Sequence, residues 1–168
     1  DQSQEVQTYR DWWFARRVDG LFMTDLMVDD PRLEILKDVG APSIIVGDPA
    51  WAHGAPAVGS DDAGAACAAV ERFAQLGHRR IGRIAGPERF VHTRVRGEAL
   101  DAAAAECGVE IVAQTFTDYS LGEGSRAFES MLSSDAPPTA IICENDLTAL
   151  GAVRRAMSMG LDVPGDVS

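Results

Sequence analysis

The feature of this chain that most limits its fold is a regular alternation of two kinds of segment. Short runs of β-branched and aliphatic residues alternate with longer stretches in which apolar residues recur at helical spacing. Strands that alternate with helices pair in parallel and are covered by those helices. The pattern therefore predicts an α/β fold, with strands at residues 20–24, 43–46, 57–59, 80–85, 115–117 and 139–143.

The stretches between these strands carry helix start and stop signals. Asp30 and Pro31 are typical of a helix N-cap and first position, and Gly40 supplies the stop. Ser120 and Glu123 have the spacing of a capping box. Asp146 is expected to cap the last helix. The predicted helices cover approximately residues 5–17, 30–40, 61–77, 93–108, 120–132 and 146–160.

A break in this pattern at residues 76–80 separates two sets of strand–helix units. We expect two lobes of similar build, an N-terminal lobe at 1–77 and a C-terminal lobe at 78–168, rather than one continuous sheet. The chain begins on a predicted helix and stops where another strand is due. The first strand of one lobe and the last strands of the other are therefore expected to be missing.

Composition narrows the class of function. Lys and Arg number 15 against 26 Asp and Glu, a net charge of −11, whereas phosphate contacts need clustered basic residues. The apolar runs are far shorter than the roughly 20 residues that a membrane span requires. Three widely spaced cysteines, Cys67, Cys107 and Cys143, are typical of reduced thiols in a cytoplasmic protein rather than of a disulfide framework or zinc site.

The sequence lacks the common signatures of enzymes and of cofactor sites. There is no phosphate-binding G-x-x-x-x-G-K loop, no dinucleotide fingerprint and no G-x-S-x-G elbow. His53, His78 and His92 are scattered, without metal-ligand spacing. We therefore expect neither an enzyme nor a cofactor or metal.

Ligands of open α/β sheets bind beside the carboxyl ends of the strands. The predicted strands of this chain are followed by carboxylates, an amide, a guanidinium and an aromatic ring. Together these groups suit a polyol or sugar ligand. Each has a simpler alternative: helix capping for the aspartates, a surface position for the arginine, strand-end packing for the tyrosine. The candidates are Asp61, Arg94, Tyr119, Asn145 and Asp146.

Several segments, taken in order, form a specific combination. It includes Leu-Gly-His-Arg-Arg-Ile at 76–81 followed by Ala-Gly-Pro at 85–87, Val-Gly-Ser-Asp-Asp at 58–62, Arg-Val-Arg-Gly at 94–97 and Ile-Cys-Glu-Asn-Asp at 142–146. This combination resembles the lactose/galactose repressor (LacI/GalR) family of bacterial transcription regulators over nearly the whole chain. Glu98 stands where that family usually has an aromatic residue.

The resemblance implies a type I periplasmic-binding-protein-like fold, in which two Rossmann-like lobes clamp a small-molecule effector. It places Arg94 and Asn145 on effector hydroxyl or carboxylate groups, with Asp146 beside them. It also implies that Tyr119 stacks on the ligand and that Asp61 lies in the cleft.

The function implied is the effector-sensing and dimerisation domain of a sugar-responsive DNA-binding repressor. Such a regulator is a cytoplasmic homodimer that contacts operator DNA through an N-terminal helix-turn-helix head, which is not among these residues. An alternative is the exported sugar-binding protein of a transporter, which shares the fold. A small α/β enzyme using Asp61, Tyr119 or Asp146 as acid or base is a third reading.

Overall fold

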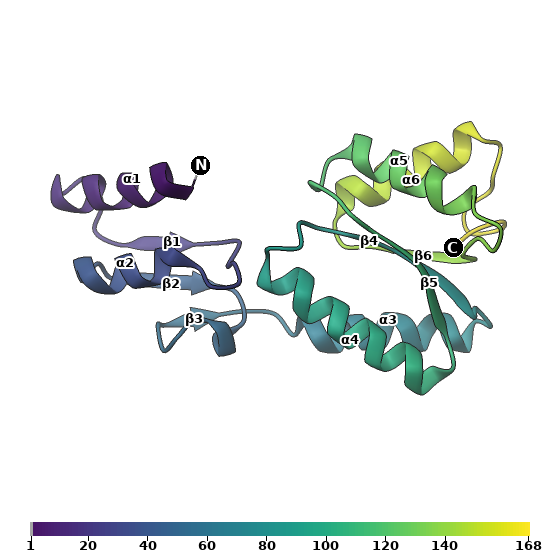
Figure 1. The fold of residues 1–168 in the computed structure, drawn as a ribbon, viewed down its shortest axis with the longest axis horizontal. Helices are drawn as coiled ribbons and strands as arrows, with labels where there is room; N and C mark the ends of the chain where they lie inside the picture. Colours follow the sequence, from purple (N-terminus) through teal and green to yellow (C-terminus); the bar gives the residue numbers. More distant parts are fainter. Residues whose placement is uncertain (1) are drawn as a thin grey trace. The chain divides into compact units, whose positions relative to one another are not determined.

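The computed structural model describes residues 2–168, with side chains from residue 4 onward. These residues form two compact units (Figure 1). The first consists of the chain up to Asp61 together with Arg89–His92, and the second of Asp62–Glu88 and Thr93–Ser168. Each unit contains a three-stranded parallel sheet, ordered β1-β2-β3 in the first and β5-β4-β6 in the second. The predicted α/β architecture with two separate sheets is confirmed.

The first unit follows the predicted segments closely. The helix that begins after Asp30 has that residue as its N-cap, since the carboxylate accepts from the backbone N–H of Arg32. It stops at Gly40, which adopts the left-handed conformation at φ 64° that glycine tolerates best. The elements are α1 (Gln2–Phe14), β1 (Leu21–Met23), α2 (Pro31–Val39), β2 (Ser43–Val46), the 3-10 turn η1 (Pro49–Trp51) and β3 (Ala57–Val58).

The sheet of the first unit buries one face. Met23 and Ile45 are opposite each other in the β1–β2 register and are both buried, as is Leu36 of α2. Phe22 and Ile44, also opposite each other, point to the other face because side chains alternate along a strand. Phe22 is 75% exposed. Apolar packing in this unit is therefore concentrated on the Met23–Ile45 side.

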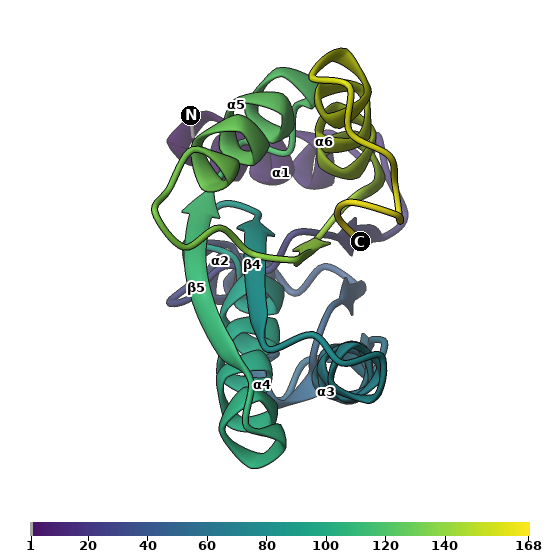
Figure 2. The same cartoon turned by 90° about the vertical axis from the view of Figure 1, so that its right-hand side faces the viewer.

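The second unit has helices on both faces of its sheet. Figures 1 and 2 show α3 and α4 on one side and α5 and α6 on the other. Ile81 on β4 packs into the core on the first side and Ile84 into the core on the second, and both are fully buried. The elements are α3 (Asp62–Gln75), β4 (Arg80–Ala85), α4 (Val91–Cys107), β5 (Glu110–Phe116), α5 (Leu121–Leu132), β6 (Ala140–Cys143) and α6 (Asp146–Ser158).

Helix α3 lies in the second unit, so the boundary between the two units comes before this helix. The predicted boundary between the lobes, at residues 77 and 78, comes after it. The physical reason is packing: Ala66 and Val70 of α3 belong to the same buried cluster as Ile81 and Leu100. The assignment of 1–77 and 78–168 to two lobes stays a prediction.

Two local predictions about the second unit were wrong. Strand β5 begins at Glu110 and not at residue 115, because it pairs with β4 from Arg80 onward although its side chains are only partly buried. The N-cap of α6 is Asn145, whose side-chain oxygen accepts from the N–H of Thr148, and Asp146 is the first helical residue. Ser120 does cap α5 through Glu123 N, as predicted.

A buried arginine ties the first unit together. The Arg32 guanidinium donates from Nε to Oδ1 of Asp30 at 2.9 Å and from Nη1 to Oε1 of Glu5 at 2.9 Å. Its Nη2 donates to the backbone oxygens of Thr24, at 3.2 Å, and Asp25, at 2.8 Å. The side chains of Arg32 and Asp30 are 5% and 0% exposed. One cation thus fixes α1, the start of α2 and the turn after β1.

The two acids of this network have altered pKa values. Burial alone would raise the pKa of Asp30, but hydrogen bonds from Arg32 and from the backbone N–H groups of Met27 and Arg32 lower it overall. A hydrogen bond from Tyr9, together with the contact to Arg32, lowers the pKa of Glu5 against the opposing effect of burial. Both carboxylates therefore hold their charge to lower pH in the folded state than in the unfolded chain.

We expect the first unit to lose stability in acid through these two groups. Because their folded pKa values are lowered, their contribution is complete above the unfolded values near 4 and is lost as pH falls through the folded values. Replacing Asp30→Asn should flatten this pH dependence and cost about 3–5 kcal/mol at neutral pH, since Arg32 is left buried without that charge partner. Urea unfolding followed by tryptophan fluorescence measures this unit selectively, because all three tryptophans, at 12, 13 and 51, lie in it.

Glu123→Gln is the control, because it removes a partly exposed carboxylate of the second unit that pairs with Arg126. It should leave the tryptophan-detected transition unchanged at every pH. An unaltered pH dependence in Asp30→Asn would show that the Arg32 network does not control acid stability.

Candidate functional site

The carboxyl ends of the second unit's strands lie at one edge of its sheet. Strand β4 pairs in parallel with β5 on one side and β6 on the other. The segments that follow these three strands supply Tyr119, Asn145, Asp146 and, on α4, Arg94. Four of the five predicted site residues therefore come from elements at this edge. The fifth, Asp61, is an exposed residue that closes the main segment of the first unit.

Asn145 and Tyr119 are held in place by contacts with the chain. The Asn145 side chain accepts from the Thr148 N–H at 2.8 Å and donates from Nδ2 to the backbone oxygen of Tyr119 at 3.3 Å. The Tyr119 hydroxyl lies 3.4 Å from Oγ1 of Thr93. Gly86 is required beside this ring, because a Cβ at that position would lie 1.9 Å from the tyrosine hydroxyl. Three separate segments thus meet around Tyr119.

The two arginines of α4 have different surroundings. Arg94 is half exposed and donates from Nε to Glu98, one turn further along the same helix, at 2.8 Å. Arg96 donates from Nε and Nη2 to Oδ1 of Asp62, at 2.9 and 2.7 Å, and from Nη1 to the backbone oxygen of Glu144 at 3.2 Å. Arg96 therefore joins α3, α4 and the end of β6, whereas the ion pair of Arg94 stays within one helix.

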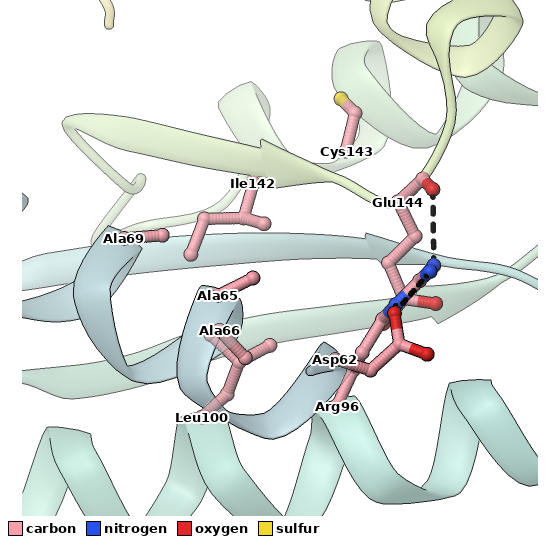
Figure 3. Close-up of a pocket in the computed structure, with 9 residues that line it drawn as sticks. All are labelled: Asp62, Ala65, Ala66, Ala69, Arg96, Leu100, Ile142, Cys143 and Glu144. Atoms are coloured by element: carbon pink, nitrogen blue, oxygen red, sulfur yellow. Dashed lines mark hydrogen bonds and ion pairs between the residues drawn. The ribbon is translucent and has the colours of Figure 1, made fainter. Parts of the chain in front are cut away.

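A pocket of about 220 Å³ is formed around Arg96. Figure 3 shows Asp62, Arg96 and Glu144 gathered at one end, where their polar groups face one another. A guanidinium held by a carboxylate presents N–H donors and acceptor oxygens side by side, which is what a ligand hydroxyl needs. The remaining walls are mainly apolar. They consist of Ala65, Ala66, Ala69, Leu100, Ile142 and Cys143.

Sequence reasoning selected Arg94 and Asp61, whereas this pocket is lined by Arg96 and Asp62. The helical period could have indicated the choice of arginine. Residues two apart on a helix point in roughly opposite directions, because each residue advances about 100°. Arg96 shares a face with Leu100, four residues on, and Leu100 is 1% exposed. Arg96 is thus the arginine on the packed side of α4.

The described residues offer neither a metal centre nor a membrane-spanning helix. Within residues 2–168, no group of three His, Cys, Asp or Glu side chains could hold a metal ion. In the same range, no helix is both long and apolar enough to cross a membrane.

Comparison with known families identifies the fold. Residues 70–168 match the family described as the periplasmic binding protein-like domain. The chain belongs to this family. The predicted arrangement of parallel sheets flanked by helices agrees with it.

Individual relatives are transcriptional regulators. The HTH-type transcriptional repressor CytR of Escherichia coli K12 is 32% identical over 99% of this chain and 50% of its own length. A LacI family transcriptional regulator from Bifidobacterium animalis subsp. lactis superimposes with a TM-score of 0.91, at 35% identity, over 100% of this chain and 62% of that one. The CelR–cellobiose complex, also a transcriptional regulator, matches with a TM-score of 0.83 at 29% identity over 98% and 51%.

These relatives confirm the resemblance to LacI-type regulators that the sequence motifs indicated. The chain spans about half the length of the curated relatives it matches.

The thiol of Cys143, which lines the pocket, is expected to be unreactive at neutral pH. Burial raises its pKa to about 11. Only the thiolate is alkylated, so iodoacetamide at pH 8 should modify Cys143 on the order of 100-fold more slowly than in the urea-unfolded chain. Peptide mass spectrometry over a time course measures this rate. Equal rates in folded and unfolded protein would contradict the buried, protonated thiol.

Proposed function

We propose that this chain is the effector-sensing and dimerisation domain of a DNA-binding transcriptional regulator of the repressor type. The observation that carries the proposal is homology over nearly the whole chain to HTH-type repressors. It is joined by a pocket with a polar end at the carboxyl edge of the second sheet, where α/β folds bind ligands.

The effector proposed is a sugar. Arg96 and Asp62 supply a fixed donor and acceptor pair for hydroxyl groups, and the alanine side of α3 leaves an apolar wall for a ring face. A similar regulator was solved with cellobiose, which makes a β-linked glucose disaccharide the first ligand to test. Arg94, Tyr119, Asn145, Asp146 and Asp61 stay predicted members of the site.

Operator DNA would be held by residues outside this chain. The net charge of −11 makes this chain a poor partner for DNA phosphates. Because a regulator of this class acts on the genome, we place it in the cytoplasm. Effector binding would favour one arrangement of the units over another and so change the affinity of the dimer for its operator.

The relatives favour this reading over a transporter's solute-binding protein, since those described above are transcriptional regulators. They favour it equally over a small α/β enzyme. No catalytic role is therefore proposed for Asp61, Tyr119 or Asp146.

Calorimetric titration of the full-length protein with cellobiose and a panel of mono- and disaccharides tests the effector site. At least one sugar should bind to the wild type. Arg96→Ala and Asp62→Asn should each weaken that binding by about 10- to 100-fold, because each removes charge-assisted hydrogen bonds worth roughly 1.5–3 kcal/mol. Arg94→Ala, measured alongside, shows whether the exposed arginine also contributes.

Arg126→Ala is the matched control, since Arg126 is exposed and forms its ion pair with Glu123 of the same helix. Its affinity should equal that of the wild type. A folded Arg96→Ala variant that binds the same sugar with unchanged affinity would remove Arg96 from the site.

The dimer is proposed to form through α6. This helix has an apolar stripe whose side chains are 38–68% exposed, formed by Leu147, Leu150, Val153 and Met157. Its opposite side, which includes Ala152, is buried. A two-fold axis near Leu150 would pair two copies of α6 antiparallel. It would also bring the acidic first turn of one copy toward Arg154 of the other. An uncharged stripe flanked by opposite charges is thus complementary to itself.

Leu150→Asp should convert the dimer to a monomer, because symmetry places the new charge at the interface twice. A buried unpaired charge costs about 3–5 kcal/mol, which corresponds to at least roughly a 100-fold weaker dimer. Sedimentation velocity of the full-length protein measures the change. Leu76→Asp, at another exposed leucine of the same unit, should leave the dimer intact. A dimer that survives Leu150→Asp would exclude this face.

A further inference from the structure

We propose that Arg83 and Glu144 are positioning residues of the effector site. They form a buried ion pair behind the pocket that holds Arg96 and the surrounding loops in their binding geometry. The inference rests on the proposed function for its meaning, but its central measurement needs no effector.

Arg83 lies on the central strand β4, and its side chain is 4% exposed. Its Nε donates to Oε1 of Glu144 at 2.8 Å, and Nη2 makes a further contact with the same oxygen. The guanidinium makes two further hydrogen bonds. Nη2 donates to the backbone oxygen of Thr93 at 2.6 Å, and Nη1 donates to Oε1 of Gln114 at 2.9 Å. One guanidinium therefore joins β4, β5, the first turn of α4 and the end of β6.

Glu144 completes the connection to the pocket. Its side chain is 2% exposed, and Oε2 accepts from the backbone N–H of Gly86 at 3.0 Å. The backbone oxygen of Glu144 accepts from Nη1 of Arg96. The carboxylate thus anchors the loop after β4, while the main chain of the same residue orients the arginine that faces the pocket.

Two contacts of the pair lead to residues at the proposed site. Thr93, held by Arg83, precedes Arg94 and contacts the Tyr119 hydroxyl. Gly86, held by Glu144, packs directly against the Tyr119 ring. Loss of the pair should therefore loosen α4 and the Tyr119 loop together.

Stability alone does not explain such a pair. Removing two charges from water costs several kcal/mol each, and apolar residues of similar volume commonly fill such positions as well or better. Apolar side chains could not hold the carbonyl of Thr93 or the N–H of Gly86. What the ions supply is a defined position for polar backbone groups next to the pocket, as preorganised binding requires.

The test replaces the pair by apolar residues of similar size, Arg83→Met with Glu144→Leu, in the full-length protein. The readout is the Nε–H NMR signal of Arg96 without effector, assigned by its disappearance in Arg96→Lys. In the wild type this signal should be distinct and protected from exchange with water. In the double variant it should move toward that of the exposed Arg126 and exchange at least tenfold faster. Affinity for the sugar that binds the wild type should fall at least tenfold.

The matched control is Arg155→Met with Glu129→Leu, which removes an ion pair between α5 and α6. It should leave the Arg96 signal and the affinity unchanged. A double variant of Arg83 and Glu144 that folds and keeps the wild-type Arg96 signal overturns the proposal. If that variant does not fold, Glu144→Gln decides, since it keeps the shape and an acceptor for Gly86. Faster exchange at Arg96 supports positioning, and no change overturns it.

Failure of the proposed function has a different signature. In that case no sugar of the panel would bind the wild type, while the Arg96 signal would still respond to the Arg83 and Glu144 variants.

Discussion

Parallel pairing of β4 with both β5 and β6 determines where the loops that follow these three strands can lie. All three strands run in the same direction, with Ala85 opposite Phe116 and Ile84 opposite Cys143. The loops after them therefore emerge at one edge although they are about 30 residues apart in sequence. Backbone hydrogen bonds, rather than attraction between side chains, bring Tyr119 and Asn145 together. The side-chain contacts then refine an arrangement that the sheet has already set.

The central strand of such a sheet is normally apolar, because helices cover both faces. Arg83 departs from this rule, and two other residues accommodate it. Glu144 supplies the opposite charge, and Gly97 on α4 leaves room for the guanidinium, since a Cβ there would lie 2.5 Å from Nη1 of Arg83. One ion pair thus takes the place of apolar packing at three positions, Arg83, Glu144 and Gly97. This exchange is favourable where the orientation of nearby polar groups matters more than the last increment of stability.

Hydrophobic period and capping residues predicted the fold class and nearly every element, because those signals are local. Strand β5 was predicted only at its end, since polar residues interrupt its alternation and pairing with β4 decides its start. The site was predicted at the carboxyl edge of the second sheet, where the pocket around Arg96 also lies, and its five predicted residues stay predictions. Motif spacing favoured Arg94, whereas packing beside Leu100 turns Arg96 toward the pocket. The Arg83–Glu144 contact joins residues 61 apart, and no local pattern reveals it.

The two sheets also differ in what stabilises them. Both faces of the second sheet are covered, as the full burial of Ile81 and Ile84 on opposite sides shows. In the first, Phe22 is three-quarters exposed, and burying such a side chain is worth roughly 1.5–3 kcal/mol that this unit does not gain by itself. Polar contacts add to the apolar packing on the other face of this sheet. Arg32, with partners on α1, α2 and the turn after β1, is the group placed to do so. The same guanidinium holds the carboxyl end of β1, so the order of that loop and the stability of the unit depend on one charge.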